Sequence, residues 1–506
     1  MRKILYLSII LSVGLIASCK KDHNNNTATS YINLDKDSIY YYEKEDYLWF
    51  DAIPAYNTFN PRSYTGSTDF DALSNEITAI SQLKINPATG KPYEYYALDP
   101  GEAKYSFVDD GTTTASLGGS NADFGFEPKY LAANDLRVKY VYPGSPADIA
   151  GLKRGYEITS INGNTDLSGT SNSNINYIVN AIYYSPSINM TLLKPDNTTI
   201  TVNFNTAAYT VNPVLTYKVF NEGSGHVVGY VVFNSFTTID NAQPKLDQAF
   251  NYFINNGVND LIVDLRYNGG GAAETAEYLD DLIVPQGAGN TLMYTQHFNS
   301  NLLNGNSPLF DKKFGTTKAD FQPTNANNRR IFSKQLSLAI NRVFFIVTSE
   351  TASSSELTMN NLRPEMDVEL VGDTTYGKPV GEYAIPLGSD GRYILYSPQV
   401  YVENSANQGD YYAGMTPGSG SYKGYIAVTD IFKDGDDLTK DFGDSTENML
   451  AHALSYVKTG TYAINKPQVQ SLLAGKQLFT ISQQKAIMRK MDQHKYKALI
   501  FNKKHK

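Results

Sequence analysis

The sequence predicts a multidomain α/β protein. Its 506 residues suffice for about three domains at roughly 150 residues each. Three apolar runs, at residues 261–265, 343–347 and 368–371, each lead into a turn rich in glycine, serine or threonine, and helical stretches follow the first two. This succession of strand, turn and helix is typical of β/α crossover units. The apolar fraction of 41% and the charged fraction of 19% fit an ordinary globular chain.

Charge, cysteine and histidine content exclude several classes of function. Lysine and arginine number 43 and aspartate and glutamate 51, so the net charge is −8. Nucleic acid is not expected as a partner, because a uniformly acidic chain binds phosphates poorly. The single cysteine, Cys19, excludes an internal disulfide framework, a thiolate metal cluster and an iron–sulfur site. The six histidines are scattered and form no H-E-x-x-H pair, so we expect no metal site.

Residues 1–18 are predicted to be a signal peptide. Two basic residues precede an apolar stretch, residues 4–16, that is too short to span a bilayer comfortably. The stretch ends in Ile16-Ala17-Ser18-Cys19, which resembles a bacterial lipoprotein signal in which Cys19 is lipidated and becomes the first mature residue. The alternative is an ordinary secretory signal with a chance cysteine. Residues 19–34 are then a lipidated cysteine and a polar linker, and a lipid anchor would hold a soluble body in the bacterial cell envelope, periplasmic or surface-exposed.

Residues 35–104 are predicted to form a small helical region, because aromatic and aliphatic side chains recur there at helical spacing. Trp49, the only tryptophan, is expected to be a packing anchor.

Residues 105–207 are predicted to be a β-rich domain. The run 138–142 predicts a strand, Ser145-Pro146 opens a short helix, and residues 156–161 predict a second strand that enters an Asn-Gly turn. This string resembles a PDZ domain, and the alternative is a generic β-rich module. Phe124, Gly125 and Phe126 stand where PDZ domains place the loop whose N–H groups receive the terminal carboxylate of a peptide. The resemblance implies that a peptide binds by adding a strand to an exposed edge.

Residues 208–458 are predicted to be the α/β core, and residues 459–506 a basic extension with ten lysines and arginines against one acid. We expect this extension to be a solvated helix or to dock on the acidic body. The acidic stretch 430–444 lacks the spacing of an EF-hand and is expected to be a solvated loop.

Two turns of the core carry the candidate chemistry. Residues 353–355 are serines at the start of a helix, where the N–H that follows a nucleophile points at developing negative charge. The glycines at 269–271 let a second N–H come close to the same negative charge, since glycine has no side chain to block the approach. The chain contains no G-x-S-x-G elbow, so no motif supports a histidine-based triad, although a distant pairing stays open. Lys378 is the other candidate base, because burial after an apolar strand favours a neutral amine.

Together these strings resemble the carboxy-terminal processing (tail-specific) serine proteases. The strings Asp264-Leu265-Arg266-x-Asn268-x-Gly270-Gly271, Ala352-Ser353-Ser354-Ser355-Glu356 and Gly377-Lys378 follow in that family's order, downstream of the PDZ-like string. The resemblance implies a Ser–Lys dyad that needs no metal or organic cofactor. It implies Ser353 as the nucleophile and Lys378 as the general base. It also implies the N–H groups of Gly270 and Ser354 as the oxyanion donors.

The chain departs from the family at three positions. Ser354 replaces a common alanine, so three consecutive serines compete for the role of nucleophile, and Pro379 follows the lysine where glycine is common. Glu382 stands where many relatives have a glutamine that helps to hold the lysine. A carboxylate there stabilises the charged amine and weakens the base unless it is protonated or turned away.

Residues 372–378 also fit the first seven positions of a P-loop, but Pro379 has no hydroxyl to bind Mg²⁺, and we reject that interpretation.

The sequence therefore predicts a lipid-anchored serine endopeptidase whose PDZ domain captures protein or peptide substrates, through a free C-terminus or an extended segment. The alternative is a catalytically inactive, peptide-binding surface lipoprotein in which Glu382 and the altered serine cluster have disabled the chemistry. A glycan-binding surface protein is a weaker third hypothesis, suggested only by the 38 tyrosines.

Overall fold

The computed structural model describes residues 25–340, 342–388, 391–429 and 432–464, and residues 479, 483, 487, 490, 491 and 498–501 of the C-terminal extension. The predicted signal peptide and Cys19 lie outside this range. Within it, no helix is both long enough and apolar enough to cross a membrane.

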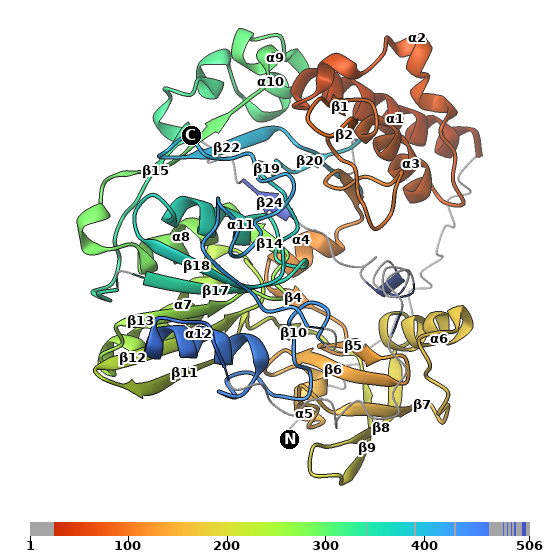
Figure 1. Ribbon diagram of the computed structural model, residues 1–506. Helices are drawn as coiled ribbons and strands as arrows, with labels where there is room; N and C mark the ends of the chain where they lie inside the picture. Colours follow the sequence, from red (N-terminus) through yellow and green to blue (C-terminus); the bar gives the residue numbers. More distant parts are fainter. Residues whose placement is uncertain are drawn as a thin grey trace, which may run out of the picture.

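The N-terminal part is a helical layer at one end of the molecule, next to α9 and α10 (Figure 1). Its elements are α1 (Asn25–Asp46), α2 (Tyr56–Phe59), α3 (Asp69–Ser81), the 3-10 turns Phe50–Ala52 and Pro61–Ser63, and the short hairpin β1 (Ile85–Asn86) and β2 (Lys91–Pro92). Ile39 of α1 and Leu73 and Ile77 of α3 are buried in the same cluster as the central sheet. Trp49 stacks on Tyr93, with ring centroids 4.7 Å apart. The prediction of a linker up to residue 34 is wrong from Asn25 onward, because a helix that is nucleated by packing farther along propagates into polar residues at little cost.

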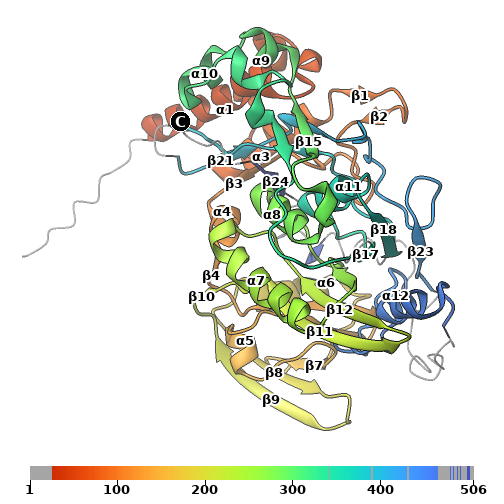
Figure 2. The same cartoon turned by 90° about the vertical axis from the view of Figure 1, so that its left-hand side faces the viewer.

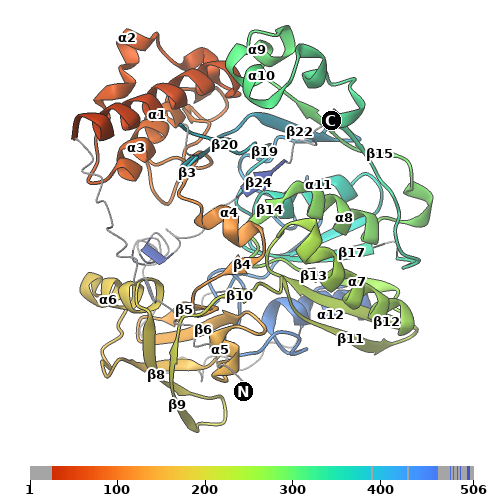
Figure 3. The ribbon, with the colours of Figure 1, turned by 180° about the vertical axis from the view of Figure 1, so that it is seen from behind.

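A five-stranded antiparallel sheet with two helices forms the opposite end (Figure 3). Its order is β5-β6-β7-β8-β9, and its elements are β5 (Phe126–Ala132), β6 (Asp135–Val141), α5 (Pro146–Ile149), β7 (Glu157–Ile161), α6 (Asn172–Tyr183), β8 (Ser187–Leu193) and β9 (Thr199–Asn205). Ser145 caps α5, because its side chain accepts a hydrogen bond from the N–H of Asp148. The module has its own apolar core, which includes Val138, Ile161 and Ile178.

A six-stranded sheet forms the centre, with the order β11-β12-β13-β17-β18-β23. Its strands are β11 (Val214–Gly223), β12 (His226–Phe233), β13 (Asp260–Asp264), β17 (Arg342–Val347), β18 (Asp367–Gly372) and β23 (Gly424–Ile426). All neighbours pair in parallel except β11 and β12. The three apolar runs predicted as strands are β13, β17 and β18, so the chain has the α/β core that the sequence predicts.

Helices cover both faces of the central sheet (Figure 2). They are α7 (Ile239–Asn255), α8 (Ala273–Ile283) and α11 (Ser354–Leu362) on one face and α12 (Asn448–Thr459) on the other. Successive side chains of a strand point to opposite faces of the sheet, so each strand contributes apolar side chains to both faces. Val263 and Phe345 pack under α7 and α8, whereas Ile262 and Phe344 pack under α12.

Shorter strands lie between the central sheet and the N-terminal layer. One sheet has the order β16-β15-β22-β19, and another the order β20-β21-β3. Their bounds are β15 (Leu292–His297), β16 (Arg329–Ile331), β22 (Val400–Asn404), β19 (Val380–Gly381), β20 (Ile385–Pro386), β21 (Ile394–Tyr396) and β3 (Phe107–Asp109). Two further pairs are β4 (Ser120–Asn121) with β10 (Tyr209–Thr210), and β14 (Gly270–Ala272) with β24 (Ala498–Ile500). The remaining helices are α4 (Thr112–Leu117), α9 (Ser300–Asn304), α10 (Pro308–Phe314) and the 3-10 turns Gln286–Ala288, Lys318–Phe321 and Ala326–Asn328.

Candidate active site

Ser353 stands at the end of the loop after β17, immediately before α11. Its φ is 63° and its ψ is −112°, a backbone conformation that L-residues rarely adopt and that functional sites often hold under strain. Neighbouring contacts fix this conformation: the N–H of Ala352 donates to the carbonyl of Asn268 at 3.1 Å, and the N–H of Ser353 donates to Glu356 Oε2 at 2.9 Å. The backbone at Ser353 is therefore held by β13's glycine turn on one side and by α11 on the other.

The three consecutive serines differ in what their hydroxyls contact. Ser354 Oγ donates to the carbonyl of Gly271 at 2.8 Å, and Ser355 Oγ donates to that of Asn268 at 3.0 Å. Ser353 Oγ is buried and makes no such bond to the glycine turn; it faces the N–H of Glu356 in the capping box that opens α11. Two of the three hydroxyls thus hold the glycine turn against α11, and Ser353 alone has a hydroxyl not engaged in this way.

The buried carboxylate of Glu356 joins the serine turn to the lysine loop. Its Oε2 accepts the N–H of Ser353 at 2.9 Å and the N–H of Lys378 at 2.8 Å. Its Oε1 accepts the N–H of Gly377 at 2.7 Å and the hydroxyl of Thr375 at 2.5 Å. Since one oxygen receives both Ser353 and Lys378, these residues lie side by side although 25 positions separate them in the chain. Burial raises the pKa of Glu356, and the four donors oppose that effect.

The side chain of Lys378 forms an ion pair with Glu382 in which both groups are fully buried. Burial raises the pKa of Glu382 to about 7, and the ammonium group of Lys378 acts against this rise. The Lys378 ammonium also lies 5.8 Å from the ring centroid of Tyr105. The carboxylate predicted to weaken the candidate base is therefore in direct contact with it.

Lys104 and Tyr105 support the lysine loop from the N-terminal part of the chain. Lys104 Nζ donates to the carbonyls of Gly377 and Tyr412, each at 3.0 Å, and Tyr105 Oη donates to the carbonyl of Gly377 at 2.7 Å. Burial lowers the pKa of Lys104 to about 8. Neither residue is predicted by the sequence, because no local motif marks a contact across more than 270 positions. Glu356 belongs to the serine motif, but the sequence does not indicate that it also binds the lysine loop.

The glycine turn adopts a conformation that only glycine accepts. Gly271 has φ 137°, and a Cβ there would lie 2.1 Å from the carbonyl oxygen of Phe236. The N–H of Gly270, a predicted oxyanion donor, donates to Asn268 Oδ1 at 2.9 Å. Ser354, the other predicted donor, is the first residue of α11, where N–H groups have no partner within the helix.

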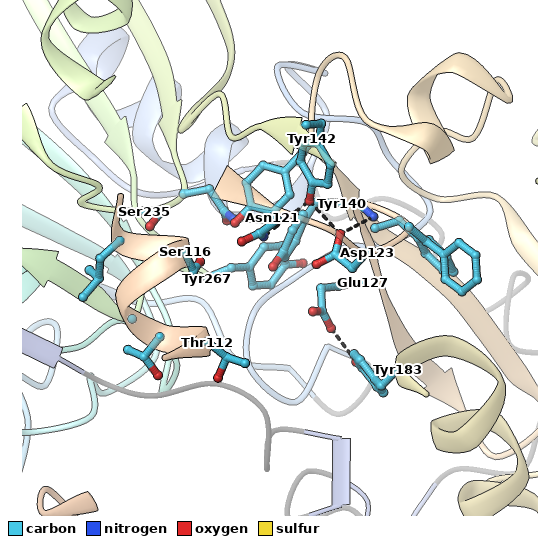
Figure 4. Close-up of a pocket in the computed structure, with 18 of the residues that line it drawn as sticks. Thr112, Ser116, Asn121, Asp123, Glu127, Tyr140, Tyr142, Tyr183, Ser235 and Tyr267 are labelled. Carbon is cyan, nitrogen blue, oxygen red and sulfur yellow. Dashed lines mark hydrogen bonds between the residues drawn. The ribbon is translucent and has the colours of Figure 1, made fainter. Parts of the chain in front are cut away.

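A pocket of about 290 Å³ extends from the predicted carboxylate-binding loop to the glycine turn (Figure 4). Phe124, Gly125 and Phe126 line it at one end, and the glycines at 269–271 line it at the other. The N–H of Gly125 donates to Asp123 Oδ1 at 2.7 Å, so this group is already occupied. Across the groove between β5 and α6, Tyr183 Oη donates to Glu127 Oε2 at 2.6 Å. The described residues that line this pocket include two carboxylates, Asp123 and Glu127, and no lysine or arginine.

A cluster of buried charges ties the five-stranded module to the strand that leads into the glycine turn. Asp436 accepts hydrogen bonds from Arg154 at 2.5 Å and from Arg266 at 2.8 Å, and Arg266 also pairs with Asp264 and Glu447. The prediction that residues 430–444 form a solvated loop is wrong at Asp436, which is 2% exposed. A carboxylate is buried there because the arginines that neutralise it come from distant parts of the chain.

Comparison with known proteins gives one family. Residues 227–417 match the profile of Peptidase family S41. The chain is 28% identical over 274 residues to the chloroplastic carboxyl-terminal-processing peptidase 1 of Arabidopsis thaliana, covering 53% of this chain and 48% of that protein. It is 25% identical over 307 residues to the carboxy-terminal processing protease CtpB of Bacillus subtilis, covering 60% and 54%. The chain thus spans about half the length of these relatives.

The fold has a counterpart among solved structures. The crystal structure of a Bacteroides fragilis protein described as an S41 protease superposes with a TM-score of 0.55 at 22% identity, covering 84% of this chain and 97% of that one. At this identity the likeness concerns the fold alone.

Proposed function

We propose that the whole chain, whose residues 227–417 match peptidase family S41, is a serine endopeptidase of the carboxyl-terminal processing type with a Ser353–Lys378 dyad. The observation that carries this proposal is the shared carboxylate oxygen of Glu356, which holds the backbone of Ser353 beside that of Lys378. The hydroxyl of Ser353 supports it, because Ser353 is the one of the three serines that is not bonded to the glycine turn, and a nucleophile must keep its oxygen available for the substrate.

In the proposed reaction, Ser353 Oγ attacks the carbonyl carbon of the scissile peptide bond while its proton passes to the neutral amine of Lys378. The N–H of Ser354 stabilises the oxyanion, and that of Gly270 joins it after leaving Asn268 Oδ1. The C–N bond then breaks, and Lys378 returns the proton to the leaving amine. Water then attacks the acyl carbon while Lys378 takes a proton from the water. The ester bond to Ser353 Oγ breaks, and Lys378 returns the proton to that oxygen, which restores both groups.

Glu382 sets the protonation state of the base in this proposal. Its negative charge stabilises the ammonium form of Lys378, whereas a protonated Glu382 would leave the amine free to accept a proton. Because burial raises the pKa of Glu382 to about 7, this carboxyl is partly protonated at neutral pH, which removes part of the negative charge beside Lys378.

We further propose that the five-stranded module is a PDZ domain that captures protein or peptide substrates. Its strand order, with α5 between β6 and β7 and α6 between β7 and β8, leaves β5 as an edge beside α6. An extended internal segment fits the groove better than a free C-terminus, because Asp123 occupies the N–H of Gly125 and no described basic side chain lines the pocket. Anchoring through Cys19 in a bacterial cell envelope belongs to the same proposal.

The test is cleavage of an unfolded protein by the body of the chain, residues 20–506, with products identified by mass spectrometry. Ser353→Ala and Lys378→Ala should each reduce cleavage to background. Ser355→Ala removes a neighbouring hydroxyl that supports the glycine turn but is not the proposed nucleophile, so it should reduce cleavage far less than Ser353→Ala does. Equal cleavage by all forms would show that another nucleophile or a contaminant acts. Absence of cleavage by every form, with tight binding of peptides, would favour the inactive peptide-binding lipoprotein.

A further inference from the structure

A strand from the far C-terminus lies inside the protease domain. Strand β24 pairs in parallel with β14, with Gly271 opposite Leu499 and Ala272 opposite Ile500. On its other side the segment bonds to Glu382: the N–H of Glu382 donates to the carbonyl of Leu499 at 2.8 Å, and the N–H of Phe501 donates to the carbonyl of Glu382 at 3.0 Å. Figure 1 shows β24 between β14 and β19.

The side chains of this segment fill apolar sites. Leu499, Ile500 and Phe501 are 0%, 7% and 4% exposed. The ring of Phe501 rests against Gly381, where a Cβ would lie 2.3 Å from it. Ile500 packs in a separate cluster around Tyr396. Successive residues of the segment therefore enter different sites, as in a peptide bound as a strand.

The segment lies between the two parts of the chain that carry the dyad. On one side, β14 begins with Gly270, the predicted oxyanion residue, and the carbonyl of its Gly271 accepts a hydrogen bond from the hydroxyl of Ser354. On the other side, Glu382 pairs with Lys378 and accepts the N–H of Leu499 on Oε2 at 3.2 Å. Ser353 and Lys378 are both 0% exposed. A second strand cannot enter this position while β24 occupies it.

The part of the extension that precedes β24 contacts the five-stranded module. Ile487 and Met491 belong to its apolar core, and the ring of Phe479 packs edge-on against Tyr130 at 5.6 Å. Lys490 Nζ donates to Asn176 Oδ1 of α6 at 3.0 Å. The extension is thus bound to the module as well as to the protease domain.

We propose that the segment 498–501 occupies the substrate channel in the manner of a substrate, so that the chain closes its own active site. The channel then takes extended polypeptide between β14 and the backbone of Glu382, with an aliphatic side chain at the site of Leu499 and an aromatic one at that of Phe501. This inference rests on the proposed protease function, because it assigns the channel to the substrate of the same dyad. A tethered segment competes at a millimolar effective concentration, so substrates bind weakly until it leaves.

Peptide binding to an inert form tests the occupancy without relying on catalysis. The probe is a fluorescent peptide of residues 495–501, measured by anisotropy against Ser353→Ala chains that end at residue 497 or at residue 501. The shorter chain should bind the probe about tenfold or more tightly than the longer one, because the longer one keeps its own strand in place. A probe with Leu499→Asp and Phe501→Asp should not bind either chain. Equal binding of the probe by both chains, or no binding by a shorter chain that unfolds cooperatively, overturns the inference.

Two full-length variants guard against misfolding of the shortened chain. Phe501→Asp should open the channel and admit the probe, whereas Gly381→Ala should exclude both the segment and the probe, since the added methyl occupies the site of the ring. With an active serine, the chain ending at 497 should cleave unfolded protein about tenfold faster than the chain ending at 501. If no form cleaves, the proposed function fails, and the anisotropy measurement still decides what occupies the channel.

Discussion

Replacing Glu356 by glutamine should separate the assembly of the dyad from the stability of the fold. The carboxylate accepts hydrogen bonds from four donors, of which three are backbone N–H groups. An amide offers one oxygen only. In the better of its two orientations, the glutamine oxygen still accepts the N–H groups of Ser353 and Lys378. Its NH₂ group then faces the hydroxyl of Thr375, which can rotate to accept a hydrogen bond. The NH₂ group also faces the N–H of Gly377, which is a donor and cannot adapt.

The size of the effect follows from these contacts. A hydrogen bond to a buried charged group contributes about 1.5–3 kcal/mol. The variant loses the bond from the N–H of Gly377 and weakens the bond to the hydroxyl of Thr375, so the free energy of unfolding should fall by about 2–4 kcal/mol. Gly377 precedes Lys378, and displacing the lysine by about 1 Å is sufficient to reduce the rate about 100-fold. We therefore expect kcat of Glu356→Gln to fall about 100-fold, with a smaller change in KM.

The assay pairs steady-state cleavage with unfolding in denaturant, followed by circular dichroism. Asp109→Asn is the matched control, because Asp109 is another buried carboxylate with four donors, all of them from α4, and it contacts neither the serine turn nor the lysine loop. That variant should lose stability while kcat falls far less. An unchanged kcat in Glu356→Gln, with stability reduced as in the control, would refute the view that this carboxylate assembles the dyad.

Three further predictions use single substitutions. Glu382→Gln removes the charge that stabilises the ammonium of Lys378, so the acid limb of the kcat/KM profile should move to lower pH by about one unit; an unmoved limb would show that Glu382 does not control the base. Burial raises the pKa of Glu76 to about 9, and neither of its carboxylate oxygens has a hydrogen-bond partner among the described residues. Between pH 4.5 and about 9, the native protein therefore keeps a proton on Glu76 that the unfolded protein releases. Stability should therefore fall by up to about 1.4 kcal/mol per pH unit between the unfolded pKa of 4.5 and the folded value, and Glu76→Gln should abolish this slope in thermal unfolding. Asp436→Asn removes the buried charge that pairs with Arg154 and should lower the free energy of unfolding by about 3–5 kcal/mol. The pKa of Asp436 is lowered in the native protein, so the wild type should lose this stabilisation as the pH falls below about 4.

The parts of the fold that the sequence predicts are those with a local signal. Strands β13 and β17 appear as continuous apolar runs because parallel strands are buried on both faces. The serine and glycine turns are recognisable because helix starts and positive φ angles restrict residue type locally. These signals are sufficient to place Ser353 and Gly270 at the ends of neighbouring strands.

The features that the sequence does not predict all depend on contacts between distant residues. Tyr105 has no motif, since its role is a single hydrogen bond to Gly377. Asp436 lies in a polar, acidic stretch, and only the arrival of Arg154 and Arg266 explains its burial. The strand at 498–501 is too short for a periodic pattern, and its position depends on free edges that β14 and Glu382 supply. In each case the partner, and not the segment itself, determines the structure.

The five-stranded module contacts both turns of the proposed active site through buried polar groups. Lys139 on β6 donates to Glu350 Oε1 at 2.6 Å, three residues before Ser353. Arg154 donates to Tyr267 Oη at 2.7 Å, immediately before the Asn268 turn. Both hydrogen bonds would break if the module moved as a rigid body, and each buried charge left unpaired would then destabilise the protein by several kcal/mol. The module therefore cannot shift without also changing the support of the turns that carry Ser353 and Gly270. The substrate binding that we propose at its β5 edge would in this way be linked to the geometry of the proposed dyad.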